Sequence, residues 1–172
     1  MLIVLLLVSY LAVDSYQERK EAASEAASHT GITYSIEGER VKIAGGTRYF
    51  GNELKTDLNG DGREDVVFLI TQSLGGTGTF FYVVAAINTE QGYIGSDGYL
   101  LGDRVAPQTT ELSQNPRHKN VIVVNYAARA DNEPMTAEPS IGKSAYLKLD
   151  SATMQWGVVE PNFEGELDAL AE

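Results

Sequence analysis

The sequence predicts an α+β fold that is mainly β, with an N-terminal helix followed by an antiparallel β-sheet or a small sandwich. Three observations predict it. An apolar N-terminus runs into an Ala- and Glu-rich stretch, which is typical of a helix. From about residue 30 onward, short segments alternate between apolar and polar residues, as half-buried strands do. Residues 66–70 (VVFLI) and 80–87 (FFYVVAAI) are continuous apolar runs, the pattern of strands buried on both faces.

Length and composition fit one domain with a short appendage. The chain has 172 residues, of which 43% are hydrophobic and 22% charged, close to the averages of globular proteins. The formal net charge is −11, and a surface this acidic repels phosphate backbones, so nucleic acid is not an expected partner. The absence of cysteine excludes disulfides, thiolate metal sites and cysteine nucleophiles.

The N-terminal segment predicts an anchor. Residues 1–13 are apolar apart from Ser9, and no Lys or Arg precedes Arg19. Thirteen helical residues span only about 20 Å, short of the ~30 Å hydrocarbon core. This segment is therefore either part of a longer membrane segment or a helix packed against protein. Because a polar stretch follows at 14–28, we favour a membrane anchor with a stalk over residues 1–29.

The rest of the chain predicts a β-rich, calcium-binding domain at 30–160 and an acidic tail at 161–172. Residues 32–43 predict a hairpin with Gly38 in the turn, and residues 48–50 a short strand. The two apolar runs are expected to be neighbours in one antiparallel sheet. Further strands are predicted at residues 99–101, 109–112, 121–126, 144–149 and 154–159. Proline-bearing loops are expected at 106–107 and 132–139.

Residues 57–65 (DLNGDGRED) are the strongest motif. Calcium binds six to eight hard oxygen ligands, and this loop offers them at alternate positions. The predicted metal ligands are the side chains of Asp57, Asn59, Asp61 and Asp65 and the carbonyl of Arg63. Gly62 permits the sharp turn that brings them together. The alternative is an acidic surface turn that is held by side-chain hydrogen bonds and binds no ion.

This loop is not an EF-hand. The twelfth position, where an EF-hand has a bidentate Glu, is Phe68 inside a predicted strand. The loop instead resembles the shorter calcium loops that run straight into a strand, as in the FG-GAP repeats of integrin-type propellers. We expect a structural role for the ion, because neutralising the clustered carboxylates would fix the entry to the 66–70 strand.

The other motifs give weaker evidence for a function. Residues 137–144 (AEPSIGKS) match a relaxed phosphate-binding loop, but a Pro-rich loop precedes them and a strand pattern follows. His29 and His118 are expected at the surface, without the Ser or Asp partner of a triad. Asp103 and Arg104 predict an ion pair that holds the fold.

Several strings together suggest a family. They are the acidic loop and residues 49–53 (YFGNE), 75–80 (GGTGTF), 102–108 (GDRVAPQ), 124–126 (VNY) and 139–144 (PSIGKS). As a set, from about residue 34 onward, they resemble a group of small bacterial proteins with one N-terminal membrane segment and an extracytoplasmic domain. The resemblance implies a location and a metal, but no reaction.

The expected function is that of a membrane-tethered, extracytoplasmic calcium-binding domain with a binding or scaffolding role in the cell envelope, and not that of an enzyme. Its expected partners are calcium, the membrane and a protein. Two alternatives stay open. One is a metal-assisted envelope hydrolase that uses Asp103, Arg104 or Ser140 in a cleft beside the metal. The other is a pilin-like filament subunit that assembles through residues 1–13.

Overall fold

The computed structural model describes residues 29–73, 75–134 and 136–161, and these consist almost entirely of strands and turns. The strands in these ranges are β1 (Tyr34–Ile36), β2 (Glu39–Val41), β3 (Thr47–Thr56), β4 (Asp65–Gln72), β5 (Phe80–Thr89), β6 (Gly92–Gly95), β7 (Tyr99–Asp103), β8 (Ala106–Leu112), β9 (Val121–Ala128), β10 (Ile141–Asp150) and β11 (Gln155–Val158).

The strands form three sheets, and every strand pairing is antiparallel. One sheet has the order β3-β4-β5-β6, with β7 also paired to β5; a second has the order β11-β10-β9-β8; and β1 and β2 form a hairpin. The prediction of a mainly β, antiparallel fold is confirmed. The predicted N-terminal helix and stalk over 1–29 lie outside the described residues except for His29, and the predicted tail at 161–172 lies outside them except for residue 161. Among the described residues no helix is long and apolar enough to cross a membrane.

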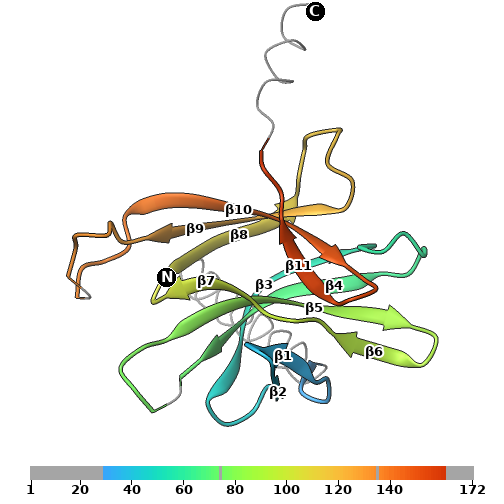
Figure 1. Cartoon of the computed structure of the whole chain (residues 1–172), viewed down its shortest axis with the longest axis horizontal. Helices are drawn as coiled ribbons and strands as arrows, with labels where there is room; N and C mark the ends of the chain where they lie inside the picture. The colour runs from blue at the N-terminus through green and yellow to red at the C-terminus, as the bar shows by residue number, and fades with distance from the viewer. Residues whose placement is uncertain (1–28, 74, 135, 162–172) are drawn as a thin grey trace, which may run out of the picture.

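The sheet containing β4 and β5 is the middle of three layers (Figure 1). On one face, Val67 and Leu69 pack with Ile122 and Leu147 of the four-stranded sheet in one core cluster. On the other face, Phe68 and Ile70 belong to a second cluster, which includes the buried side chains of the β1 hairpin. Successive side chains of a strand point to opposite faces, so burial on both faces requires a continuous apolar run.

The two apolar runs are neighbours, as the sequence predicted. Strands β4 and β5 pair from Val66↔Ala86 to Gln72↔Phe80 without a register shift. The predicted hairpin is also present, with β1 and β2 joined at Glu37 and Gly38. Both turn residues have positive φ, 52° and 85°, the backbone geometry that favours two-residue hairpin turns.

The structure differs from the predictions at β6 and at the start of β8. Strand β6 was not predicted, because its four residues form an edge strand whose side chains are mostly exposed and carry no alternating pattern. Residues 106–107 were expected in a loop, yet they begin β8. Pro107 is tolerated there because β8 is an edge strand and its pairing shifts register between Pro107 and Thr109. An edge strand and a bulge are the positions where a missing N–H costs little.

The β1 hairpin lies close against the segment that follows β6. The amide of Gly98 donates to the carbonyl of Ser35 at 2.7 Å, and the amide of Ser35 donates to the carbonyl of Ser96 at 3.2 Å. A Cβ added at Gly95 would lie 2.3 Å from the carbonyl oxygen of Thr33 and 2.7 Å from the ring of Tyr34. The absence of a side chain at this position therefore permits the contact.

We expect Gly95→Ala to lower the free energy of unfolding by about 1–3 kcal/mol, because a backbone carbonyl cannot move aside as a flexible side chain would. The matched control is Gly142→Ala, in another strand, where an added Cβ meets no atom within 4 Å. Urea unfolding of both variants checks this. Equal stability of the two would show that the hairpin does not pack here.

Candidate functional site

The acidic loop connects β3 to β4 and bends back on itself at two glycines. Gly60 and Gly62 have φ of 81° and 83°, the left-handed region in which a side chain is strained. Three consecutive amides of this turn, those of Gly60, Asp61 and Gly62, donate to Asp57. Its Oδ1 accepts from Gly60 N at 2.7 Å and Asp61 N at 3.2 Å, and its Oδ2 accepts from Gly62 N at 2.8 Å. The first carboxylate of the motif thus organises the whole turn.

Asp61 is the second centre of the loop. It accepts from the backbone amide of Arg63 at 2.8 Å, from the Arg63 guanidinium at 2.8 Å and from Asn59 Nδ2 at 3.0 Å. The Arg63 amide is the main reason that the pKa of Asp61 lies below its ordinary value, and the Asn59 and Arg63 side chains add to the effect. Asp61 is therefore ionised at neutral pH. Its side chain is also exposed to solvent.

Asp65, the last predicted ligand, is turned into the fold. Its side chain has no exposed surface, and its two oxygens accept from Leu58 N at 2.9 Å and Asn88 N at 2.8 Å. Burial raises the pKa of Asp65, the two amide bonds oppose this rise, and the charges of Asp61 and Asp57 add to it. The residue thus ties the loop to β5 while its ionised form carries an electrostatic cost.

The loop is also fixed at its base to both sheets. Leu58 is 4% exposed and belongs to the core between the sheets. Its carbonyl accepts from Asn120 Nδ2 at 2.9 Å, just before β9, and Arg63 Nε donates to the carbonyl of Asn88 at 3.0 Å. Asn88 and Asn120 are therefore the partners that hold the loop. Sequence reasoning missed both, since neither has a local pattern that connects it to residues 57–65.

The side chains of the loop carry carboxylate and amide oxygens, which are the kinds of ligand atom that calcium prefers. A carboxylate has about four acceptor positions and an amide oxygen has two. With the hydrogen bonds above in place, Asp57, Asn59, Asp61 and Asp65 each keep at least one position open. Among the described residues, however, no three His, Cys, Asp or Glu side chains converge as a metal-binding group. Asp65 faces inward and the Arg63 guanidinium lies against Asp61, so ion binding requires side chains to rearrange.

The other predicted residues lie elsewhere. Asp103 forms an ion pair with Arg104 at 2.9 Å and accepts from Thr79 N at 2.8 Å, beside the start of β5. Asp65 is bonded to Asn88, near the opposite end of the same strand. Ser140 is exposed in the approach to β10. The structure thus does not bring Asp103, Arg104 and Ser140 to the acidic loop.

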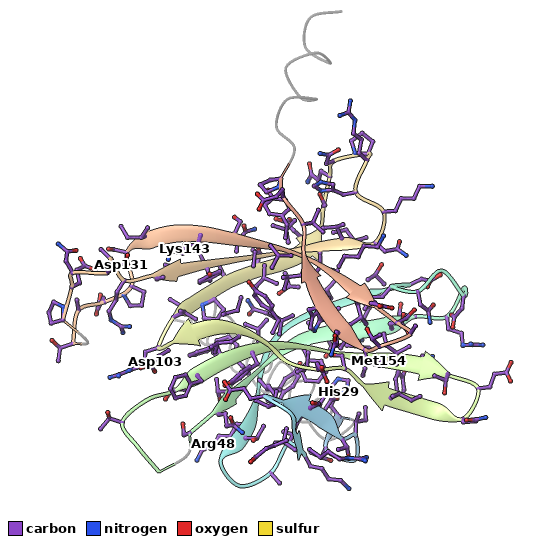
Figure 2. The ribbon with its side chains drawn as sticks, viewed as in Figure 1. His29, Arg48, Asp103, Asp131, Lys143 and Met154 are labelled. Carbon is purple, nitrogen blue, oxygen red and sulfur yellow. The ribbon has the colours of Figure 1, made fainter. Side chains whose placement is uncertain are left out.

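The surface prediction for His29 is wrong. His29 is 6% exposed, its ring stacks on Phe68 with centroids 4.5 Å apart, and its Nε2 lies 3.4 Å from a carboxylate oxygen of Glu53. It is labelled in Figure 2, close to the β1 hairpin. His118 is half-buried, with Nδ1 2.8 Å from Ser113 Oγ. Among the described residues no carboxylate bonds to His118, so the third member of a triad is missing from this pair.

The segment that matches a phosphate-binding loop leads directly into β10, from Ile141. A phosphate loop must open a helix whose N-terminal amides face the ligand. The strand that follows supports the interpretation that the match is accidental.

Comparisons with known proteins gave no match, whether to a protein-family model, to a curated protein or to a solved structure. The family resemblance described above stays a prediction.

In calcium-free protein, Asp65→Ala should lower the free energy of unfolding by about 2–4 kcal/mol, because two amides at a buried site lose their acceptor. Asp65→Asn should lower the free energy of unfolding by less, since the side-chain amide oxygen can still accept one of the two backbone hydrogen bonds. The matched control is Asp61→Ala, at an exposed position of the same loop, which should change stability little. Urea unfolding of the full chain in a mild detergent with EGTA makes the comparison. If Asp65→Ala were as stable as Asp61→Ala, Asp65 would not anchor the loop.

Proposed function

We propose that this chain is a calcium-stabilised extracytoplasmic domain that is tethered to the cell membrane by its N-terminal segment and has a binding or scaffolding role in the cell envelope. The acidic loop carries the proposal. Its oxygen-bearing side chains lie on a glycine-bent turn that is anchored in both sheets through Leu58 and Asp65. The tether is supported by the apolar residues 1–13 and the polar stretch after them.

A bound cation would act on the fold through charge. Asp57, Asp61 and Asp65 are three carboxylates within one nine-residue loop, and the charges of the first two raise the pKa of the third. A divalent ion would offset this repulsion and would favour the folded state by its binding free energy. The role is structural in this proposal, since Asp65 is buried and bonded to the backbone rather than directed at a substrate.

Calcium at millimolar concentration should raise the melting temperature of the full chain above its value in EGTA, and Asp61→Ala should abolish the rise. The physical reason is that Asp61 is an exposed carboxylate with an open acceptor position, so its loss removes a ligand and leaves the fold intact. Asp150→Ala is the matched control, because it is an exposed aspartate whose pKa is also lowered by a backbone amide, that of Ala152. It should keep the calcium response. A rise that survives Asp61→Ala, or no rise at all, would mean that the loop binds no ion.

The stabilisation by calcium should grow with pH. Because the pKa of Asp65 is raised in the folded state, its protonation favours folding; that contribution is complete below the unfolded pKa of about 4 and is lost as the pH rises through the raised value. Calcium replaces the proton as the countercharge. The difference in free energy of unfolding with and without calcium should therefore increase from about pH 4 to about pH 7. Denaturant titrations at several pH values test this, and a difference that is constant over the range would contradict it.

A further inference from the structure

A second candidate site lies at the end of the sandwich opposite the acidic loop. A cleft of about 320 Å³ opens there between the end of β7 and the facing ends of β9 and β10. Asp103 on its wall pairs with Phe80 at the first residue of β5, whereas the acidic loop is held by Asn88 near the last. The cleft is therefore separate from the proposed calcium site, and neither proposal rests on the other.

The floor of the cleft is apolar and continuous with the core. Leu101 and Val105 are each 8% exposed, Ala128 is 9% exposed, and all three belong to the cluster between the two sheets. Tyr126 packs against this cluster and also lines the cleft. A concave site with an apolar floor and few polar groups is the usual form of a small-molecule pocket.

Two basic side chains, Lys143 and Arg129, also line the cleft, and neither forms a direct ion pair with a carboxylate of the described residues. Lys143 pairs directly with Tyr126 across β9 and β10, so both side chains lie on the face that lines the cleft. Among the described residues Lys143 makes no ion pair and no side-chain hydrogen bond. Arg129 donates to the carbonyls of Ala137 and Asp103, which orient the guanidinium. In the described part of the chain it forms no direct ion pair, but its charge contributes to lowering the pKa of the nearby Asp103 carboxyl.

Two of the three acidic side chains that line the cleft accept hydrogen bonds. The Asp103 carboxylate bonds to Arg104 and to the amide of Thr79, and the Glu133 carboxylate accepts from the amide of Ala130 within its own loop. Asp131 is exposed in that loop and forms no ion pair in the described part of the chain. Figure 2 shows Asp103, Asp131 and Lys143 at this end of the molecule. The charged groups of the lining that remain open to a ligand are Lys143 on β10, Arg129 directly after β9 and, on the rim, Asp131.

The wall of the cleft is built rigidly. Arg104 has φ of 50°, an uncommon value for a residue with a side chain. Its amide donates to the carbonyl of Thr79 at 2.7 Å, and Thr79 N donates back to Asp103 at 2.8 Å. Backbone strain of this kind persists where the surrounding contacts fix it, and it is enriched at ligand sites. A fixed wall reduces the ordering cost of binding.

We propose that this cleft binds a small amphipathic carboxylate, whose charged group meets Arg129 and Lys143 and whose apolar body covers the floor at Leu101, Val105 and Ala128. The apolar floor beside these two cations would favour an acid with an apolar body over a simple anion.

Isothermal titration of the full chain with hexanoate tests the proposal, with acetate, hexanol and hexylamine as analogues and a detergent blank subtracted. We expect hexanoate to bind more tightly than all three. Lys143→Gln should weaken hexanoate binding about tenfold or more, because one charged hydrogen bond is lost. Lys148→Gln is the matched control, an exposed lysine on the same strand outside the cleft, and should leave the affinity unchanged.

Further variants and conditions distinguish this proposal from its alternatives. Ala128→Leu should fill the floor and remove binding, and a melting curve shows whether this variant folds; if it does not, the two lysine variants decide alone. Asp61→Ala and EGTA should not change the hexanoate affinity, which separates this proposal from the calcium loop. Absence of hexanoate binding, equal binding of acetate or hexanol, preference for hexylamine, or equal effects of the two lysine variants would each overturn the proposal.

Discussion

The middle sheet must be covered on both faces, and the arrangement of the other elements follows from this constraint. Strands β4 and β5 contribute fully buried side chains to two separate core clusters, one on each side. A single additional layer would leave half of these apolar side chains in water. This exposure would lower the stability of the fold by about 25 cal/mol per Å² of apolar surface. The four-stranded sheet covers one face and the β1 hairpin contributes to covering the other, which gives the three layers of Figure 1.

Polar groups sit at the two ends of this buried strand pair. At one end Asp65 is enclosed, and its carboxylate satisfies the amides of Leu58 and Asn88. At the other end Asp103 caps the Thr79 amide while Arg104 balances its charge. An unpaired amide would cost most at the buried Asp65 end and less at the part-buried Asp103 end. Each aspartate therefore has a structural role that does not depend on a ligand. The calcium proposal adds an ion to the first end, and the carboxylate proposal adds a ligand beside the second.

Sequence patterns anticipated local features better than pairings between distant residues. The nine-residue loop, its two glycines and its oxygen-bearing side chains could be recognised because all lie within one short segment. The roles of Asn88 and Asn120 could not, since they hold the loop from positions 23 and 62 residues away from their partners. The burial of His29 was missed for the same reason: its partners Phe68 and Glu53 belong to strands that only the folded chain brings to it.

The mainly β class, most of the strands and the adjacency of the two apolar runs could be predicted from the sequence, because alternation and continuous apolar runs are patterns of neighbouring residues. Tertiary structure alone decided which faces the runs present, that Asp65 points inward, and that Lys143 and Arg129 share a cleft with Leu101. These depend on strand register and sheet packing, in which one residue of shift moves every side chain to the other face.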